Sequence, residues 1–213
     1  MLFSIVFFAF FEQSGGSLSF FAADNLNDEI LGMHLSPNGV NNSANSLFVI
    51  AFAALVGLVW LWMAKRKIEP NTVIKFGLAF VFLAGGFWVF YYTQFFACEF
   101  GKTSLGVFTF GWLIITFGEL CLSPIGMSAM TKLSPQKTQA VIMGMWFLAS
   151  AYGQYFAGLL GANIAEASAN ATNLEKLIVY ADGYKQLAIY ALVAGLVLII
   201  ISPFVKKLMQ GVK

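Results

Sequence analysis

Six long apolar runs constrain the fold of this chain more than any other feature of its sequence. They cover residues 1–23, 46–64, 73–96, 105–130, 141–164 and 187–205. A helix of about 20 residues spans the hydrocarbon core of a bilayer, and a backbone in lipid must satisfy its own hydrogen bonds. The sequence therefore predicts an all-α membrane protein whose six transmembrane helices form one bundle.

The composition agrees with this class and excludes others. Apolar residues make up 59% of the chain and charged residues 10%, whereas soluble domains have roughly half and a quarter. The net charge of +2 provides no basic surface for a nucleic acid. The runs contain neither a nucleophile beside a base nor metal-ligand spacing, so we expect no enzyme, no metal and no organic cofactor.

The charges between the runs predict how the chain crosses the membrane. Nine of the twelve basic residues fall on one side: Lys65, Arg66, Lys67, Lys75, Lys132, Lys137, Lys206, Lys207 and Lys213. The opposite side carries the other three together with seven acidic residues. Because cytoplasmic loops are enriched in Lys and Arg, we expect a multi-pass protein of the cytoplasmic membrane with both termini inside.

Two carboxyl groups, those of Glu12 and Glu119, lie deep inside apolar runs. Inserting an ionised carboxylate at such depth costs about 2.5–3.5 kcal/mol, so each group needs a proton or a partner. No Lys or Arg is placed at comparable depth by the sequence, so a cation must come from outside this chain. Glu12 is therefore a candidate proton-binding site, with a neutral, hydrogen-bonded packing role as the alternative. Its neighbour Gln13 could be a polar packing contact.

The beginning of the chain also suggests an absent partner. No basic residue precedes the first run, so nothing in this sequence anchors its cytoplasmic end. We therefore expect the chain to be the second part of a longer protein, with a true start at Met1 as the alternative.

Three further side chains are candidates whose positions leave two interpretations open. Ser123 lies one turn after Glu119 on the same face, where it either binds a ligand or covers the carbonyl that Pro124 leaves unbonded. Asn45 begins the second run, and an ordinary N-cap explains an Asn there. Trp146 lies deep for an interfacial ring, and it either packs in the core or lines a pocket.

Other patterns predict how the helices pack. Gly153, Ala157 and Gly161 recur at intervals of four, which indicates a helix-packing face. Gly15 and Gly16 are expected to loosen the helix just beyond the first acid. The aromatic end of the third run is typical of an interfacial belt, and the last run, apolar on all faces, is expected to face lipid.

Four blocks of the sequence together resemble the C-terminal helices of proton-dependent oligopeptide transporters, which belong to the major facilitator superfamily. The blocks are Phe11-Glu12-Gln13-Ser14, Asn45-Ser46-Leu47-Phe48, Gly118-Glu119-Leu120-Cys121-Leu122-Ser123-Pro124 and Met143-Gly144-Met145-Trp146-Phe147-Leu148. They come in the order and with the spacing of that family and extend over essentially the whole chain. The resemblance implies two six-helix bundles, of which this chain would form the second, helices seven to twelve. The N-terminal bundle would be its partner.

The resemblance also implies roles for the candidate residues. Glu12 is similar to the helix-seven acid of proton coupling, which pairs with a basic residue of helix one. Glu119 resembles the helix-ten acid that pairs with a helix-four lysine and faces the amino end of a bound peptide. Asn45 resembles a helix-eight Asn that contacts the same end, and Trp146 looks like a pocket-wall aromatic. Phe8 stands where many members have Trp, which weakens an otherwise expected substrate contact.

The function implied is proton-coupled uptake of di- and tripeptides across the cytoplasmic membrane, with this chain as half of the carrier and protons as the coupling ion. Ser46 replaces the usual Pro after the helix-eight Asn, with little consequence expected. The intramembrane cations of the family lie in its first bundle and have no counterpart here. Two alternatives are another substrate, such as nitrate or a peptide-like drug, and a non-transporting membrane scaffold. Six more helices upstream, with intramembrane Arg and Lys, would favour the transporter.

Overall fold

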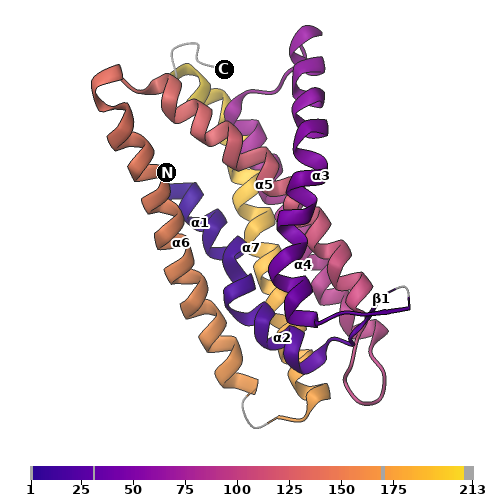
Figure 1. Cartoon of the computed structure of the whole chain (residues 1–213). Helices are drawn as coiled ribbons and strands as arrows, with labels where there is room; N and C mark the ends of the chain where they lie inside the picture. Colours follow the sequence, from indigo (N-terminus) through magenta and orange to yellow (C-terminus); the bar gives the residue numbers. More distant parts are fainter. Residues whose placement is uncertain (1, 31, 169–170, 209–213) are drawn as a thin grey trace.

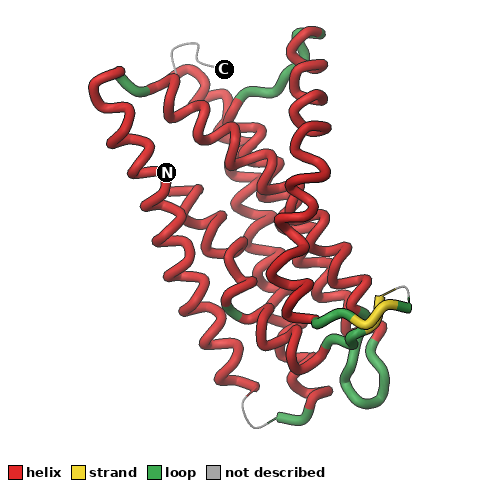
Figure 2. The backbone as a smooth tube through the Cα atoms, in the orientation of Figure 1, coloured by secondary structure: helices red, strands yellow, loops and turns green. Residues whose placement is uncertain are grey.

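The computed structural model describes residues 2–30, 32–168 and 171–208 and is almost entirely helical (Figure 1). Its elements in chain order are α1 (Leu2–Phe11), the 3₁₀ turn η1 (Glu12–Gly15), α2 (Ser17–Asn25), β1 (Glu29–Ile30), β2 (Met33–His34), α3 (Pro37–Lys65), α4 (Thr72–Tyr92), η2 (Thr93–Phe96), α5 (Leu105–Leu133), η3 (Gln136–Thr138), α6 (Gln139–Ser168) and α7 (Asn173–Leu208). The two strands pair as a short antiparallel hairpin at one end of the bundle (Figure 2). The predicted all-α membrane fold is thereby confirmed.

Five segments within the described residues are long and apolar enough to cross a membrane. They are Leu2–Asn25, Pro37–Lys65, Thr72–Phe96, Leu105–Leu133 and Asn173–Val205. The sixth predicted span lies in α6, which is as long as its neighbours but carries Gln154 between two tyrosines in its middle. α6 is not among the five segments, and these polar groups interrupt its apolar stretch.

The second predicted span begins earlier than its apolar run. α3 starts at Pro37 instead of residue 46, because the Ser36 hydroxyl accepts a hydrogen bond from the Gly39 amide at 3.3 Å and proline favours the first helical position. Asn45 therefore lies inside α3, and its interpretation as an N-cap is wrong.

The last helix also begins before its apolar run. α7 starts at Asn173, because Thr172 and Glu175 form a capping box with hydrogen bonds in both directions. The prediction that this helix faces lipid is wrong for one of its faces, which packs along α4. Glycines permit this close approach, since a Cβ atom at Gly195 would lie 2.9 Å from the carbonyl oxygen of Gly77. The opposite face of α7 is exposed.

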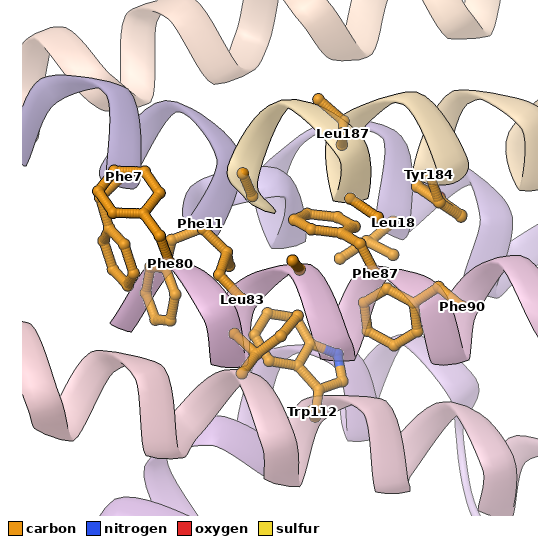
Figure 3. Packing of buried hydrophobic residues seen from close by; sticks show 14 of the residues in the cluster. Phe7, Phe11, Leu18, Phe80, Leu83, Phe87, Phe90, Trp112, Tyr184 and Leu187 are labelled. Atoms are coloured by element: carbon orange, nitrogen blue, oxygen red, sulfur yellow. The ribbon is translucent and has the colours of Figure 1, made fainter. Parts of the chain in front are cut away.

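α4 lies at the centre of the bundle, where it packs against both α5 and α7. Aromatic rings fill the space between these helices and the first span (Figure 3). Phe80, Phe87 and Phe90 of α4 are fully buried, and the Phe90 ring stacks on Phe108 of α5 with 5.0 Å between ring centroids. The predicted interfacial belt is therefore wrong for Phe87 and Phe90, which belong to the core, whereas Tyr92 is exposed.

The small residues of α6 pack against the first span, which confirms their prediction as a packing face. A Cβ atom at Gly153 would overlap the Cβ atom of Phe8 in α1, and one at Gly161 would lie 2.8 Å from the Ser17 amide nitrogen in α2. Ala157, between the two glycines, is buried. The two backbones thus approach more closely than larger side chains would allow.

One asparagine ties the end of the bundle that carries the hairpin. Asn25 is fully buried, and its side-chain amide donates to the carbonyl oxygens of Gly101 (2.8 Å) and Asn173 (2.7 Å). The Thr103 amide donates in turn to the Asn25 carbonyl at 2.7 Å. Gly101 has a φ of 71°, and a Cβ atom there would lie 2.6 Å from the Asn173 backbone, so a side chain would not fit. Three segments distant in sequence therefore meet at Asn25.

We expect Gly153→Ala to destabilise the protein, because the added methyl group would overlap Phe8. Overpacking of this kind costs about 1–3 kcal/mol, which thermal unfolding in detergent would report as a lower Tm. Gly158→Ala on the same helix is the matched control, since a Cβ atom there meets nothing within 4 Å. Equal melting temperatures for the two variants would contradict the close contact.

Candidate functional site

The first span breaks at its acidic candidate. α1 ends at Phe11, and Glu12 opens the turn η1 before the helix resumes at Ser17. Gly16 has non-helical backbone angles (φ −114°, ψ −122°), which confirms the predicted loosening beyond Glu12. The half-buried Glu12 therefore lies at an irregular turn rather than within a continuous helix.

Gln13 holds this break in place. Its side chain is fully buried, and the amide nitrogen donates to the carbonyl oxygens of Ala9 (3.1 Å) and Ala157 (3.2 Å). The amide oxygen accepts a hydrogen bond from the Ser17 hydroxyl at 2.8 Å. These bonds join α1, α2 and α6 across the turn, so the interpretation of Gln13 as a polar packing contact is confirmed.

Glu12 meets an amide and another acid instead of a cation. The Gln154 side chain of α6 lies beside its carboxyl group. Glu119 lies close enough for the two acids to repel each other when both are ionised. Within the part of the chain that the structure describes, neither acid belongs to an ion pair. The need for a proton or an external cation, inferred from the sequence, therefore persists in the folded bundle.

Glu119 is held by an amide from a neighbouring helix. It lies in the middle of α5, and Asn45 Nδ2 of α3 donates to Glu119 Oε2 at 2.8 Å. The same nitrogen lies 3.2 Å from Thr116 Oγ1, and that hydroxyl donates its own hydrogen to the Trp112 carbonyl at 2.8 Å. Asn45, Thr116 and Glu119 thus form one polar cluster. Among the described residues, no three potential metal ligands lie together.

Thr116 belongs to this cluster although the sequence did not single it out. It lies three residues before Glu119, a spacing that places both on one face of α5 and was the available signal. A threonine in a helix often bonds a carbonyl one turn earlier, as Thr116 does. This local bond explains the threonine by itself. Its second contact, with Asn45, could not be predicted because it depends on how α3 packs against α5.

Ser123 lies one turn beyond Glu119 and directly before Pro124. Its hydroxyl is buried and has no hydrogen-bond partner among the described residues. It therefore does not cover the carbonyl that Pro124 leaves free in α5. A buried hydroxyl without a partner is costly, and its role in ligand binding stays a prediction.

Phe8 and Trp146 meet inside the bundle. Only 6% of Phe8 and 2% of Trp146 are exposed, and their rings stand edge to face with 6.4 Å between centroids. A Cβ atom at Gly126 of α5 would overlap the Trp146 ring, so the indole fills space that a glycine leaves open. The core-packing interpretation describes Trp146 in this structure, and Phe8 is buried against it. Contact of either residue with a substrate stays a prediction.

Lys75 lies deeper than an exposed linker residue. It belongs to the beginning of α4 and is buried, and its ammonium group pairs with Glu69 at 2.5 Å. It also lies over the Trp60 ring, 4.7 Å from the ring centroid. Lys75, counted with the basic side of the chain and lying at the start of the third predicted run, thus belongs to the buried beginning of α4. Because Glu69 already pairs with it, Lys75 does not neutralise either deep acid.

Comparison with known proteins gives consistent matches. The POT family profile matches residues 1–178. The peptide transporter YePEPT of Yersinia enterocolitica is 35% identical over 160 residues, which are 74% of this chain and 31% of that protein. Dipeptide and tripeptide permease A of Erwinia pyrifoliae is 30% identical over 211 residues, which are 99% of this chain and 42% of the permease. The chain thus spans less than half the length of these relatives.

Solved structures match the fold in the same way. A mutant of a peptide transporter POT, crystallised in complex with alafosfalin, superimposes with a TM-score of 0.82 at 30% sequence identity. The superposition covers 99% of this chain and 40% of that transporter. The six-helix arrangement described above is therefore present within a larger solved protein.

We expect Gln13→Leu to destabilise the break in the first span, because leucine has a similar size but cannot bond Ala157 or Ser17. Leaving buried polar groups unpaired costs about 1–3 kcal/mol, measurable as a lower Tm in detergent. Gln136→Leu, at an exposed position of η3, serves as the control. Unchanged stability of the Gln13→Leu protein would show that these bonds do not hold the turn.

Proposed function

Because this chain belongs to the POT family, we propose that it forms the C-terminal half of a transporter that carries di- and tripeptides into the cell with protons. An N-terminal six-helix bundle would be its partner, and the complete carrier would lie in the cytoplasmic membrane with both termini inside. The observation that carries this proposal is the hydrogen bond from Asn45 to Glu119 beside the second acid, Glu12.

The Asn45–Glu119 pair has the chemistry to bind a peptide amino group. A carboxylate accepts strong, charge-assisted hydrogen bonds from an ammonium group. Asn45 bonds one oxygen, Oε2, and so holds the carboxyl group in one orientation. A substrate amine would supply the cation that Glu119 lacks among the described residues. Glu119 would then alternate between the substrate and a lysine of the other bundle.

Glu12 is the proposed carrier of the coupled proton. It lies at the break in the first span, beside Gln154 and within the electrostatic field of Glu119. A proton on one of two interacting acids, or an ammonium group beside it, changes the proton affinity of the other. A basic residue of the N-terminal bundle would compete with this proton. Separation of the two bundles would break that pair and allow Glu12 to bind a proton.

A peptide-like drug is the second candidate substrate, and nitrate is less favoured. The mutant transporter with 30% identity was solved with alafosfalin, which supports a broader specificity than natural peptides. Nitrate is an anion and offers no hydrogen-bond donor to Glu119, so two neighbouring acids are a poor site for it. Competition of unlabelled alafosfalin or nitrate with labelled dipeptide uptake distinguishes these substrates.

We expect Glu12→Gln in the complete protein to abolish peptide accumulation driven by a proton gradient, because an amide does not bind and release the coupled proton. Downhill exchange of labelled peptide should persist, since the Asn45–Glu119 pair is intact. Glu99→Gln, at an exposed acid outside the spans, is the control. Accumulation at the wild-type level in the Glu12→Gln protein would refute the role of Glu12.

We expect Glu119→Ala to raise the Kd for a dipeptide, measured by calorimetry, because a charge-assisted hydrogen bond is lost. Such a bond contributes about 1.5–3 kcal/mol, which corresponds to roughly 10- to 100-fold in Kd. An N-acetylated dipeptide, which has no ammonium group, should bind the variant and the parent protein alike. Asn45→Ala should show a smaller loss, and Asn42→Ala, exposed on the same helix, none. An unchanged dipeptide Kd in Glu119→Ala would remove this residue from the site.

A further inference from the structure

An apolar groove runs between α3 and the neighbouring helices α4 and α5. It has a volume of about 520 Å³, and its walls include Leu55, Val59 and Trp60 of α3 with Phe82 of α4 and Phe117 of α5. Its lining side chains are all of apolar type, and none belongs to the polar cluster around Glu119. The groove is therefore a site of a different chemical kind.

The groove exists because α3 diverges from the bundle toward its C-terminal end. α3 packs against α5 and α2, whereas α4 packs chiefly on α5 and α7. Figure 1 shows the end of α3 standing apart from the other helices. The most apolar 18-residue stretch of α3 has none of its residues buried in the bundle. This part of the helix consequently needs an apolar cover.

Three exposed basic residues follow one end of the groove along the chain. Met63 and Pro70 line that end, and between them the chain carries Lys65, Arg66 and Lys67. The three basic side chains are exposed, and none forms an ion pair with an acid of the described residues. The one nearby acid in this connection is already paired with the buried lysine of α4. A positively charged segment of the chain is thus adjacent to the apolar groove.

Trp60 adds a hydrogen-bond donor at the same place. It lines the groove, and its indole nitrogen is buried without a hydrogen-bond partner among the described residues. The Lys75 ammonium group lies over its ring at 4.7 Å. A buried indole N–H usually finds an acceptor, so the Trp60 N–H lacks a partner that such a group normally has.

We propose that the groove binds one acyl chain of an anionic phospholipid, with the phosphate group held by Lys65 and Arg66. The leaflet is the one on the basic side of the bundle, where anionic headgroups attract Lys and Arg. The glycerol ester group lies at the level of Trp60, which forms part of the groove wall. The lipid covers the exposed face of α3 and joins its free end to α4 and α5.

The size of the groove favours a hydrocarbon chain over a protein helix. A helix with its side chains is about 10–12 Å across and rises 5.4 Å per turn, so about one turn would fill the volume. A longer partner helix would therefore contact the groove over a small part of its length. The unpaired basic residues also call for an anion, which a phosphate group supplies and an apolar helix does not.

The acyl-chain site is tested by filling the groove. Native mass spectrometry of the full-length protein in detergent measures retained phosphatidylglycerol for Leu55→Trp and for Leu58→Trp. Both leucines are exposed on α3, but only Leu55 lines the groove. Leu55→Trp should retain roughly tenfold less lipid, the equivalent of two CH₂ groups no longer buried, and Leu58→Trp should match the parent protein. Equal retention by both variants would overturn the proposal.

The headgroup site is tested by removing its charge. The double variant Lys65→Gln with Arg66→Gln should bind phosphatidylglycerol roughly 30-fold more weakly, and should bind phosphatidylcholine with matched acyl chains as the parent does. The control double variant, Lys132→Gln with Lys137→Gln, removes the same charge elsewhere on the basic side. It should bind both phosphatidylglycerol and phosphatidylcholine as the parent protein does. Equal weakening of phosphatidylglycerol by both double variants would show non-specific attraction and contradict the site.

A third measurement identifies the occupant in the native membrane. A photo-crosslinking amino acid in place of Val59, inside the groove, should yield a lipid adduct that mass spectrometry identifies. Crosslinking to a polypeptide, from another part of the carrier or from a second copy, would overturn the proposal. These readouts do not measure transport, so their failure is distinguishable from failure of the proposed peptide and proton sites.

Discussion

A carboxyl group surrounded by hydrocarbon needs a hydrogen-bond donor, a proton or a cation, and this need organises the centre of the bundle. The described chain supplies neutral amides: Asn45 donates a hydrogen bond to Glu119, and Gln154 lies beside Glu12. An amide satisfies part of this demand without adding charge, so neither acid is neutralised by a cation among the described residues. A lysine in place of the amide would form an ion pair with the acid, as Lys75 of α4 does with Glu69.

Irregular backbone at membrane depth is tolerated where protein covers it, and the first span illustrates how. The turn that places Glu12 interrupts the helical ladder, and Gln13 bonds the freed region to α6 and α2. Gly153 and Gly161 allow α6 close enough for those bonds to form. The location of the acid thus depends on residues that have no chemical role of their own.

Much of this architecture is predictable from the sequence, because bilayer thickness sets the length of an apolar run and the run is directly readable. The length of an apolar run does not give the starts of α3 and α7, because polar segments capped by Ser36 and Thr172 extend these helices beyond their runs. The family resemblance assigned Asn45 and Glu119 to the same end of a bound peptide but did not predict their hydrogen bond, and position alone favoured a cap for Asn45. Thr116 escaped notice because its second contact depends on the packing of α3 against α5, which no local pattern encodes.

The asparagine at the hairpin end has a consequence for how the protein is made. Asn25 bonds to carbonyl groups of residues 76 and 148 positions further along the chain. A ribosome delivers segments in order, so Asn25 reaches the membrane surface long before Asn173 exists. The hydrogen bond from Asn25 to the Asn173 carbonyl therefore forms only after the beginning of α7 has been synthesised. Until then, water can occupy that place on the Asn25 amide. Early helices must therefore stay in register during elongation without the tie that later joins them.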